Sequence, residues 1–296
     1  MKKSKVSCIA FLLIVALFSG QLLIAESVTI EPAKDNSIYS EGNLSNGKGW
    51  YLLAGKTAAT GGFSFRRALI QFDIATAVPA GATINSVSLQ MYVSKKPQGD
   101  SQSWPFTLNR VTSDWGEGTS NAPLNEGEGT SATTGDATWA HTFFPSSNWS
   151  TPGGDFEPNP SATQNLSGKG LYTWSGPQMA LDVQAWLDNP STNFGWIVQG
   201  PNVDKTARQF HSRENEDMAP NPPANPPKLT INYTPGVSEW AGYPIDEDGR
   251  TVDTGAYLGV VDIAADPWVW VYDLGKYVYL PESHVMSGGG WSFFPN

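Results

Sequence analysis

The sequence predicts an all-β protein: an antiparallel β-sandwich of jelly-roll type with one short helix. Many short segments alternate apolar and polar residues, which is the two-residue period of a strand with one buried face. Helical periodicity occurs once, whereas a parallel α/β fold needs helices between most of its strands. The 30 Gly, 22 Pro and 12 Trp, with only 16% charged residues, are typical of an extracellular β-protein with long polar loops.

The first 25 residues have the pattern of a secretory signal peptide. Three lysines within the first five residues precede an apolar run, and we expect cleavage after Ala25. An uncleaved membrane anchor is the alternative, because the run is close to spanning length. Cys8 is the only cysteine, so the mature chain has no disulfide, cysteine-bound metal or cysteine nucleophile. We therefore expect a secreted protein, extracellular or attached to the cell surface.

The mature chain is acidic. Without the three signal lysines it has 15 basic and 28 acidic residues, a net charge of −13. Such a chain is a poor candidate for binding nucleic acid or anionic lipid, so we expect no nucleic-acid partner and no membrane contact beyond the signal segment. An acidic polysaccharide would need a local cationic patch or a bridging cation.

The sandwich is expected over residues 26–235, around a central strand at 66–74. In that strand Ala68, Ile70 and Phe72 share one face, and Leu69 lies on the other. Further strands are predicted at 27–31, 50–54, 84–94, 106–112, 138–144, 170–174, 194–199, 208–213 and 228–234.

The one predicted helix covers residues 177–189, where Met179, Val183, Trp186 and Leu187 share a face. Residues 114–172 form a long irregular region, and its repeated aromatic residues predict an ordered, packed excursion instead of disorder.

Several of these segments resemble DNRLRE-type domains, in the same order. The matching segments are 35–39 (DNSIY), 68–73 (ALIQFD), 87–92 (VSLQMY), 210–215 (FHSREN) and 227–233 (PKLTINY), with 114–118 (DWGEG) and 153–156 (GGDF) typical of one subgroup. DNRLRE-type domains are β-sandwich modules of secreted bacterial proteins, related to a carbohydrate-binding family with alginate-binding members. The resemblance covers residues 28–235 and implies a role in binding or display.

Residues 236–296 form a separate, aromatic-rich C-terminal module. A hairpin is expected from residues 268–272 and 277–280 around the turn at 273–276, with Trp268, Trp270 and Tyr272 on one face and Tyr277 with Tyr279 opposite them. These rings form either the core of a small module or an exposed binding ladder. The module is similar to short C-terminal modules of other secreted bacterial proteins, which suggests attachment or association.

A sugar-binding surface needs flat aromatic rings beside polar groups, because the C–H face of a pyranose stacks on a ring. Candidate carbohydrate-binding residues in loop-rich regions are Trp104, Trp115, Trp139, Trp149 and Trp174. The alternative for each is that it packs the excursion against the sandwich.

Two further sets of polar residues are candidates for binding or structure. Asp35, Asn36 and Asp73 are oxygen donors that could bind a structural calcium ion, although calcium needs six or more oxygens and no cofactor is required by the sequence. Arg213 is expected to pair with Asp73 or with Glu214 in a structural network.

Catalysis is not predicted. The three histidines, His141, His211 and His284, lie in no nucleophile or metal-binding motif. The sequence therefore predicts a non-catalytic protein that binds extracellular polysaccharide, and the resemblance implies an alginate-like one. The alternative is a structural protein of the cell surface or matrix that associates with other protein chains through residues 240–296.

Overall fold

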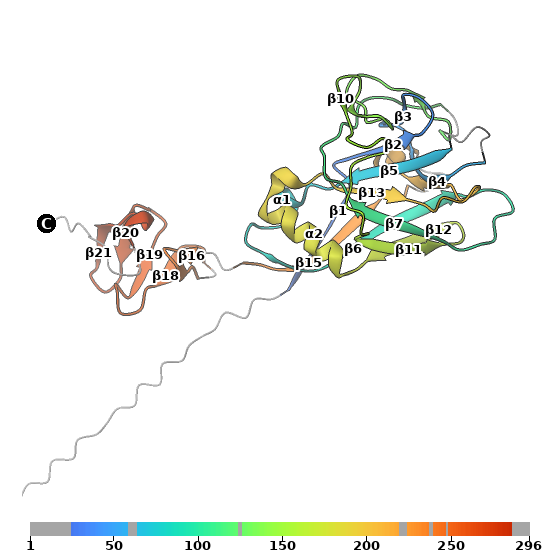
Figure 1. The fold of residues 1–296 in the computed structure, drawn as a ribbon. Helices are drawn as coiled ribbons and strands as arrows, with labels where there is room; N and C mark the ends of the chain where they lie inside the picture. The colour runs from blue at the N-terminus through green and yellow to red at the C-terminus, as the bar shows by residue number, and fades with distance from the viewer. Residues whose placement is uncertain are drawn as a thin grey trace, which may run out of the picture.

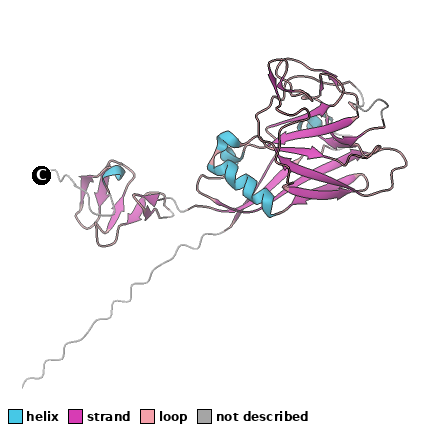
Figure 2. Ribbon diagram, viewed as in Figure 1, coloured by secondary structure: helices cyan, strands magenta, loops and turns pink. Residues whose placement is uncertain are grey.

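The computed structural model describes residues 25–58, 64–123, 126–218, 224–236, 239–246 and 248–285. All of its strand pairs are antiparallel, and the predicted all-β, sandwich-like fold is confirmed (Figure 2). The predicted signal peptide, residues 1–25, lies outside the described residues except for Ala25.

The large sheet curls on itself into two layers (Figure 1). The first layer contains β1 (Glu26–Ile30), β15 (Lys228–Thr234), β6 (Thr83–Lys95), β12 (Gly170–Ser175), β14 (Arg208–His211) and β4 (Tyr51–Lys56). The second layer contains β2 (Lys34–Tyr39), β5 (Phe65–Gln71), β13 (Trp196–Gln199), β7 (Trp104–Arg110) and β11 (Ala162–Leu166).

The strand β4 joins the two layers. Its residues 51–54 pair with β14 of the first layer, whereas Gly55 and Lys56 pair with β5 of the second. Gly55 has a φ of 107°, and a Cβ atom there would lie 2.8 Å from the carbonyl oxygen of Thr206. Glycine is therefore needed where the strand passes between layers.

The main hydrophobic core fills the space between the layers. Ala68, Ile70 and Phe72 contribute to it on the face that the sequence predicts. The helix α2 (Pro177–Asp188) packs along β6 and buries its predicted apolar face in this core. Pro177 occupies the first turn of the helix, where its missing N–H costs no hydrogen bond.

Two predicted strands end earlier than expected. The central strand stops at Gln71, because Asp73 accepts a hydrogen bond from the backbone N–H of Thr76 over 3.3 Å and caps the short helix α1 (Ile74–Ala77). The strand predicted at 208–213 stops at His211 and continues as the 3₁₀-helix η2 (Arg213–Met218). Two more 3₁₀-helices are η1 (Pro190–Thr192) and η3 (Glu282–His284).

The long excursion packs against the outside of the second layer. Its Trp115, Ala137 and Trp149 form a second hydrophobic cluster with Leu69 of β5 and Ile197 of β13. As a result β5 is buried on both faces. The small strands of this region are β3 (Leu44–Ser45), β8 (Thr130–Ser131), β9 (His141–Phe143) and β10 (Ser147–Asn148), paired as β3 with β8 and β9 with β10.

The C-terminal module has a hydrophobic cluster of its own, made of Trp240 and the aliphatic side chains of four strands. These strands form the sheet β18-β19-β20-β21, beside the short pair β16 and β17. Their bounds are β16 (Glu239–Trp240), β17 (Tyr243–Pro244), β18 (Thr251–Asp253), β19 (Val260–Asp262), β20 (Trp268–Val271) and β21 (Lys276–Tyr279). Residues 286–296 of the predicted module lie outside the described residues.

Candidate binding surfaces

Three of the five tryptophans predicted to bind carbohydrate are buried. Trp115 and Trp174 have no exposed surface, and Trp149 retains 4%. Each indole N–H donates to a backbone carbonyl over 2.8–2.9 Å, so both the ring and its polar group are satisfied inside the protein. The prediction is corrected for these residues, because a sugar has no access to their rings. They anchor the excursion and the main core.

The other two predicted tryptophans are half-buried. Trp104 packs against the main core, and its indole N–H lies 3.3 Å from a carboxylate oxygen of Asp100. Trp139 stacks on Phe65 with ring centroids 6.1 Å apart. The guanidinium of Arg67 lies 4.8 Å from the ring centroid of Trp139, within the range of a cation–π contact.

The predicted pair of Arg213 and Glu214 belongs to a network of charged side chains. Nη2 of Arg213 lies 2.9 Å from Glu214 and 2.6 Å from Glu117, and Nζ of Lys48 contacts the same two carboxylates. Asp73, the other predicted partner of Arg213, caps α1 instead. The prediction that Asp73 belongs to this network is therefore corrected.

The proposed calcium ligands are not brought together. Asn36 uses its side-chain oxygen to accept from Ser45 and Asn46 and its amide to donate to a backbone carbonyl, and Asp73 is the helix cap. The carboxylate of Asp35 lies within 4.8 Å of the carboxylates of Glu117 and Glu214 instead.

Two cationic side chains, Lys48 and Arg213, already pair with two of these three carboxylates, Glu117 and Glu214. Calcium prefers six or more oxygen ligands and no competing cations. The donor set fits an ion-pair network better than a calcium site.

Asp35 is the buried member of the network. Its carboxylate accepts the backbone N–H of Arg213 over 2.9 Å, and its other oxygen has no hydrogen-bond partner among the described residues. Burial, with a contribution from the negative charge of Glu214, raises the pKa of Asp35 well above its ordinary value. The folded environment therefore stabilises the neutral carboxyl relative to the carboxylate.

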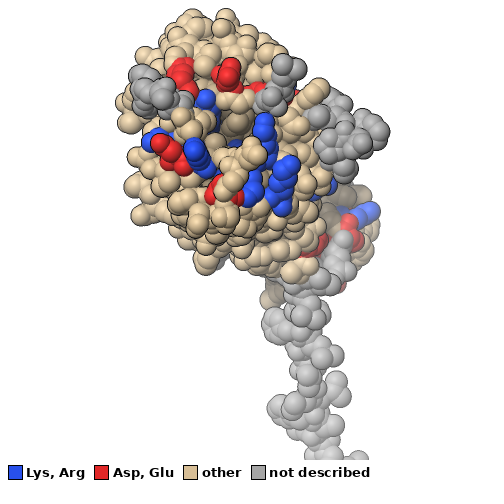
Figure 3. All heavy atoms as spheres, turned by 90° about the vertical axis from the view of Figure 1, so that its right-hand side faces the viewer, with Lys and Arg blue, Asp and Glu red and all other residues tan. Residues whose placement is uncertain are grey.

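Three neighbouring hollows of the sandwich, with volumes of about 210, 520 and 280 Å³, are here together called the basic groove. The first and second hollows share Thr57 and Gly127, and the second and third share Arg66. Figure 3 shows Lys and Arg gathered around a hollow on one face of the protein. The charged residues that line the basic groove are Lys95, Lys96, Arg208, Arg66, Arg67, Glu41 and Glu128.

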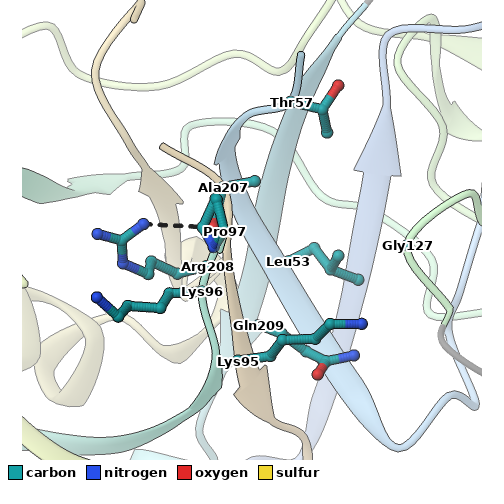
Figure 4. A pocket seen from close by; sticks show the side chains of 9 residues that line it. All are labelled: Leu53, Thr57, Lys95, Lys96, Pro97, Gly127, Ala207, Arg208 and Gln209. Atoms are coloured by element: carbon teal, nitrogen blue, oxygen red, sulfur yellow. Dashed lines mark hydrogen bonds between the residues drawn. The ribbon is translucent and has the colours of Figure 1, made fainter. Parts of the chain in front are cut away.

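Not all of these cations are open to a ligand. Arg208 is completely buried and pairs with Asp100 at 2.6 Å, and Arg66, 5% exposed, pairs with Glu41 at 2.5 Å. In the first hollow, Lys96 and Arg208 extend to one side of β14, and Lys95 and Gln209 extend to the other (Figure 4). Lys95 is exposed and Lys96 half-buried.

Arg67 lies at the third hollow, beside Phe65. Its guanidinium donates to the carbonyl oxygen of Gly153 over 2.6 Å, and no carboxylate pairs with it among the described residues. Burial lowers the pKa of Arg67 to about 10, so its charge persists at neutral pH. Lys95 is therefore the most exposed cation of the basic groove, whereas Lys96 and Arg67 are partly buried and donate to the backbone carbonyls of Asp100 and Gly153.

Four of the five aromatic residues of the C-terminal hairpin are exposed, and Trp270 is half-buried. The inner face of the hairpin is aliphatic, with Val269, Val271 and Val278 facing the core, and the alternating Trp268, Trp270 and Tyr277 lie on the other face. Of the two interpretations left open by the sequence, the structure has the exposed ladder.

A scan against known protein families finds no matching family model, and a search of curated proteins finds no similar one. The DNRLRE-type resemblance therefore remains a prediction. Among the described residues, no helix is long and apolar enough to cross a membrane.

Sequence reasoning missed the basic groove and the role of Glu117. The groove combines a Lys pair at the end of β6 with an Arg pair near the start of β5. Paired basic residues at strand ends in an acidic chain were the available signal. Glu117 had no local signal, because its partner Arg213 is 96 residues away.

Proposed function

We propose that this is a secreted, non-catalytic protein whose sandwich binds an acidic, alginate-like polysaccharide in the basic groove. The observation that carries the proposal is the charge of the groove. Of its seven charged lining residues, Arg208 and Arg66 are buried and paired with Asp100 and Glu41, which leaves Lys95, Lys96 and Arg67 against Glu128, although the mature chain has a net charge of −13. The groove supplies the local cationic patch that an acidic polysaccharide needs on an acidic protein.

The lining has the groups that recognition of a uronate chain requires. The ammonium group of the exposed Lys95 would pair with a sugar carboxylate, Lys96 would add positive charge from the other side of β14, and Gln199 and Asn202 at the third hollow would bond hydroxyls. The stacked rings of Phe65 and Trp139 lie at the same end and offer apolar surface to the C–H face of a pyranose. The resemblance to DNRLRE-type domains, with their alginate-binding relatives, supports the same class of ligand.

Individual exposed ion pairs contribute only about 0–1 kcal/mol each. Useful affinity would therefore come from several contacts along one polymer chain, which raise the effective concentration of the next sugar unit. Binding of this kind is weakened by salt, because the Debye length falls to about 3 Å at 1 M ionic strength.

The test is retention of the mature chain in native gels containing alginate, compared with the variant Lys95→Ala/Lys96→Ala. We expect the double variant to bind about tenfold more weakly, the equivalent of about 1.4 kcal/mol, because a sugar carboxylate loses its partner and the first hollow loses both of its lysine charges. Rising salt should weaken binding by the native chain. Retention should persist in the presence of a chelator, which separates direct binding by lysine from bridging by calcium.

The matched control is Lys228→Ala/Lys276→Ala, which removes the same two charges outside the groove lining. Its retention should equal that of the native chain. The proposal fails if the native chain is not retained by alginate or another uronate polymer, or if both double variants lose retention equally.

A further inference from the structure

The sheet of the C-terminal module has one aliphatic and one aromatic face. The inner face packs valines into the module core. The outer face, here called the aromatic face, consists of Trp268, Trp270, Tyr272, Tyr277 and Tyr279. Trp268, Tyr272, Tyr277 and Tyr279 are 42, 52, 51 and 38% exposed. Contiguous exposed rings on a small module usually mark a binding surface.

The rings meet in two cross-strand pairs. Trp268 lies over Tyr279 with centroids 5.1 Å apart, and Trp270 lies over Tyr277 at 5.0 Å. Such pairs stabilise a hairpin, which is one reason for aromatic residues here. Stabilisation alone does not account for the exposure, because the pairs leave large parts of the rings in water while the inner face of the same two strands packs valines into the core.

The charge of the module restricts what can bind there. Residues 236–296 contain 2 basic and 9 acidic residues, a net charge of −7, whereas residues 26–235 contain 13 and 19, a net charge of −6. The module therefore carries about half of the negative charge in about a fifth of the length. Repulsion disfavours an acidic polysaccharide, an anionic lipid surface or a second copy of the module.

The chemistry of the face indicates a sugar. Every ring on it belongs to Trp or Tyr, which combine an apolar face with a polar N–H or O–H. Next to it, Asp262 of β19 pairs with Trp270 across the sheet and forms an ion pair with Arg250. A pyranose offers the complementary surface, with apolar C–H faces and hydroxyls at the rim. We propose that the aromatic face is a second carbohydrate site, for a glycan of uncharged pyranose units.

The test uses the full mature chain in native gels that contain barley β-glucan, xyloglucan or galactomannan, with alginate in parallel. The variant Trp268→Ala/Tyr277→Ala removes one ring from each pair. We expect it to bind at least one of the neutral glycans about tenfold more weakly than the native chain, which corresponds to about 1.4 kcal/mol. Binding to alginate should not change.

The matched control is Trp50→Ala, since Trp50 is 41% exposed but belongs to the sandwich. It should bind neutral glycans like the native chain. If the double variant does not fold, Tyr272→Ala, which lies outside both pairs, should show the same direction of change.

Three results would overturn this proposal. They are the absence of neutral-glycan binding by the full chain, an equal loss of binding in the Trp50 control, and a concentration-dependent doubling of mass that the Trp268→Ala/Tyr277→Ala variant abolishes. The last result would indicate that the aromatic face binds a second copy of the chain, and it would favour the alternative of a structural protein that associates with other chains. Alginate binding is tested with the separate variant Lys95→Ala/Lys96→Ala, so this proposal and the proposed function can fail independently.

Discussion

Asp35 places a carboxyl where water cannot reach it, next to two other carboxylates. Its neighbours Glu117 and Glu214 are neutralised by Lys48 and Arg213, and Asp35 itself receives only a backbone N–H from Arg213. Burial raises its pKa, so the folded protein holds the proton more tightly than the unfolded chain. The contribution of this residue to stability is therefore greatest at low pH and is lost as pH rises through its raised pKa.

The variant Asp35→Asn should remove this pH dependence. Asparagine stays neutral, its oxygen can accept the N–H of Arg213, and its amide can donate to the nearby carboxylates. We expect the stability of the variant relative to the native chain to increase as pH rises from about 4 to 8, with a slope of at most about 1.4 kcal/mol per pH unit for one proton.

Urea denaturation at a series of pH values would measure the difference. A difference in unfolding free energy that stays constant with pH would show that Asp35 is ionised in the folded state, contrary to this interpretation. Glu128→Gln, which replaces an exposed acid elsewhere, provides a control with the same change of charge.

At the residue level the sequence predicted that Arg213 pairs with Asp73 or with Glu214, and the structure has the pair with Glu214. It could not predict Glu117, which comes from a loop distant in sequence, or the burial of Trp115. Irregular loops have no period that assigns a side chain to the inside or outside. Only the folded structure therefore separates the tryptophans of the excursion into buried anchors and half-buried rings.

Secondary-structure elements were easier to predict where apolar and polar residues, or the two faces of a strand, alternate regularly. The alternation of Ala68, Leu69 and Ile70 predicted the two faces of β5, and the structure buries them in two different clusters. The four-residue α1 was missed because it is too short for helical periodicity. The crossing of β4 between layers was also missed, since a single glycine in a strand does not reveal which sheet each half joins.

The substitution Gly55→Ala tests the importance of the glycine at which β4 passes from one layer to the other. The substitution forces alanine into a left-handed conformation and pushes Cβ to 2.8 Å from the carbonyl oxygen of Thr206. We expect the unfolding free energy to fall by about 3 kcal/mol, from strain and overpacking together.

The matched substitution Gly81→Ala has a φ of 79° with no atom within 4 Å of the added Cβ, so it should cost only about 1 kcal/mol of strain. Chemical denaturation of both variants would measure the two costs. Equal losses would mean that crowding at the crossing is unimportant.

For the whole molecule, the separate clusters of the sandwich and the module predict two unfolding units. The main core includes Leu229, and the module core includes Leu280, both fully buried. Differential scanning calorimetry should show two transitions. Leu229→Ala should lower only the larger one and Leu280→Ala only the smaller one, each by about 2–5 kcal/mol of unfolding free energy. A single transition that moves in both variants would show that the two parts unfold together.

The pairing of β1 with β15 joins the first strand of the sandwich to its last, with Glu26 opposite Tyr233. Under the export that we propose, a chain that emerges from its N-terminus cannot complete this sheet until residue 234 has emerged. Long-range pairing of this kind also slows folding, because distant segments must meet before the strands can pair. The topology would thus delay completion of the sandwich until nearly all of it has reached the compartment in which we propose that it acts.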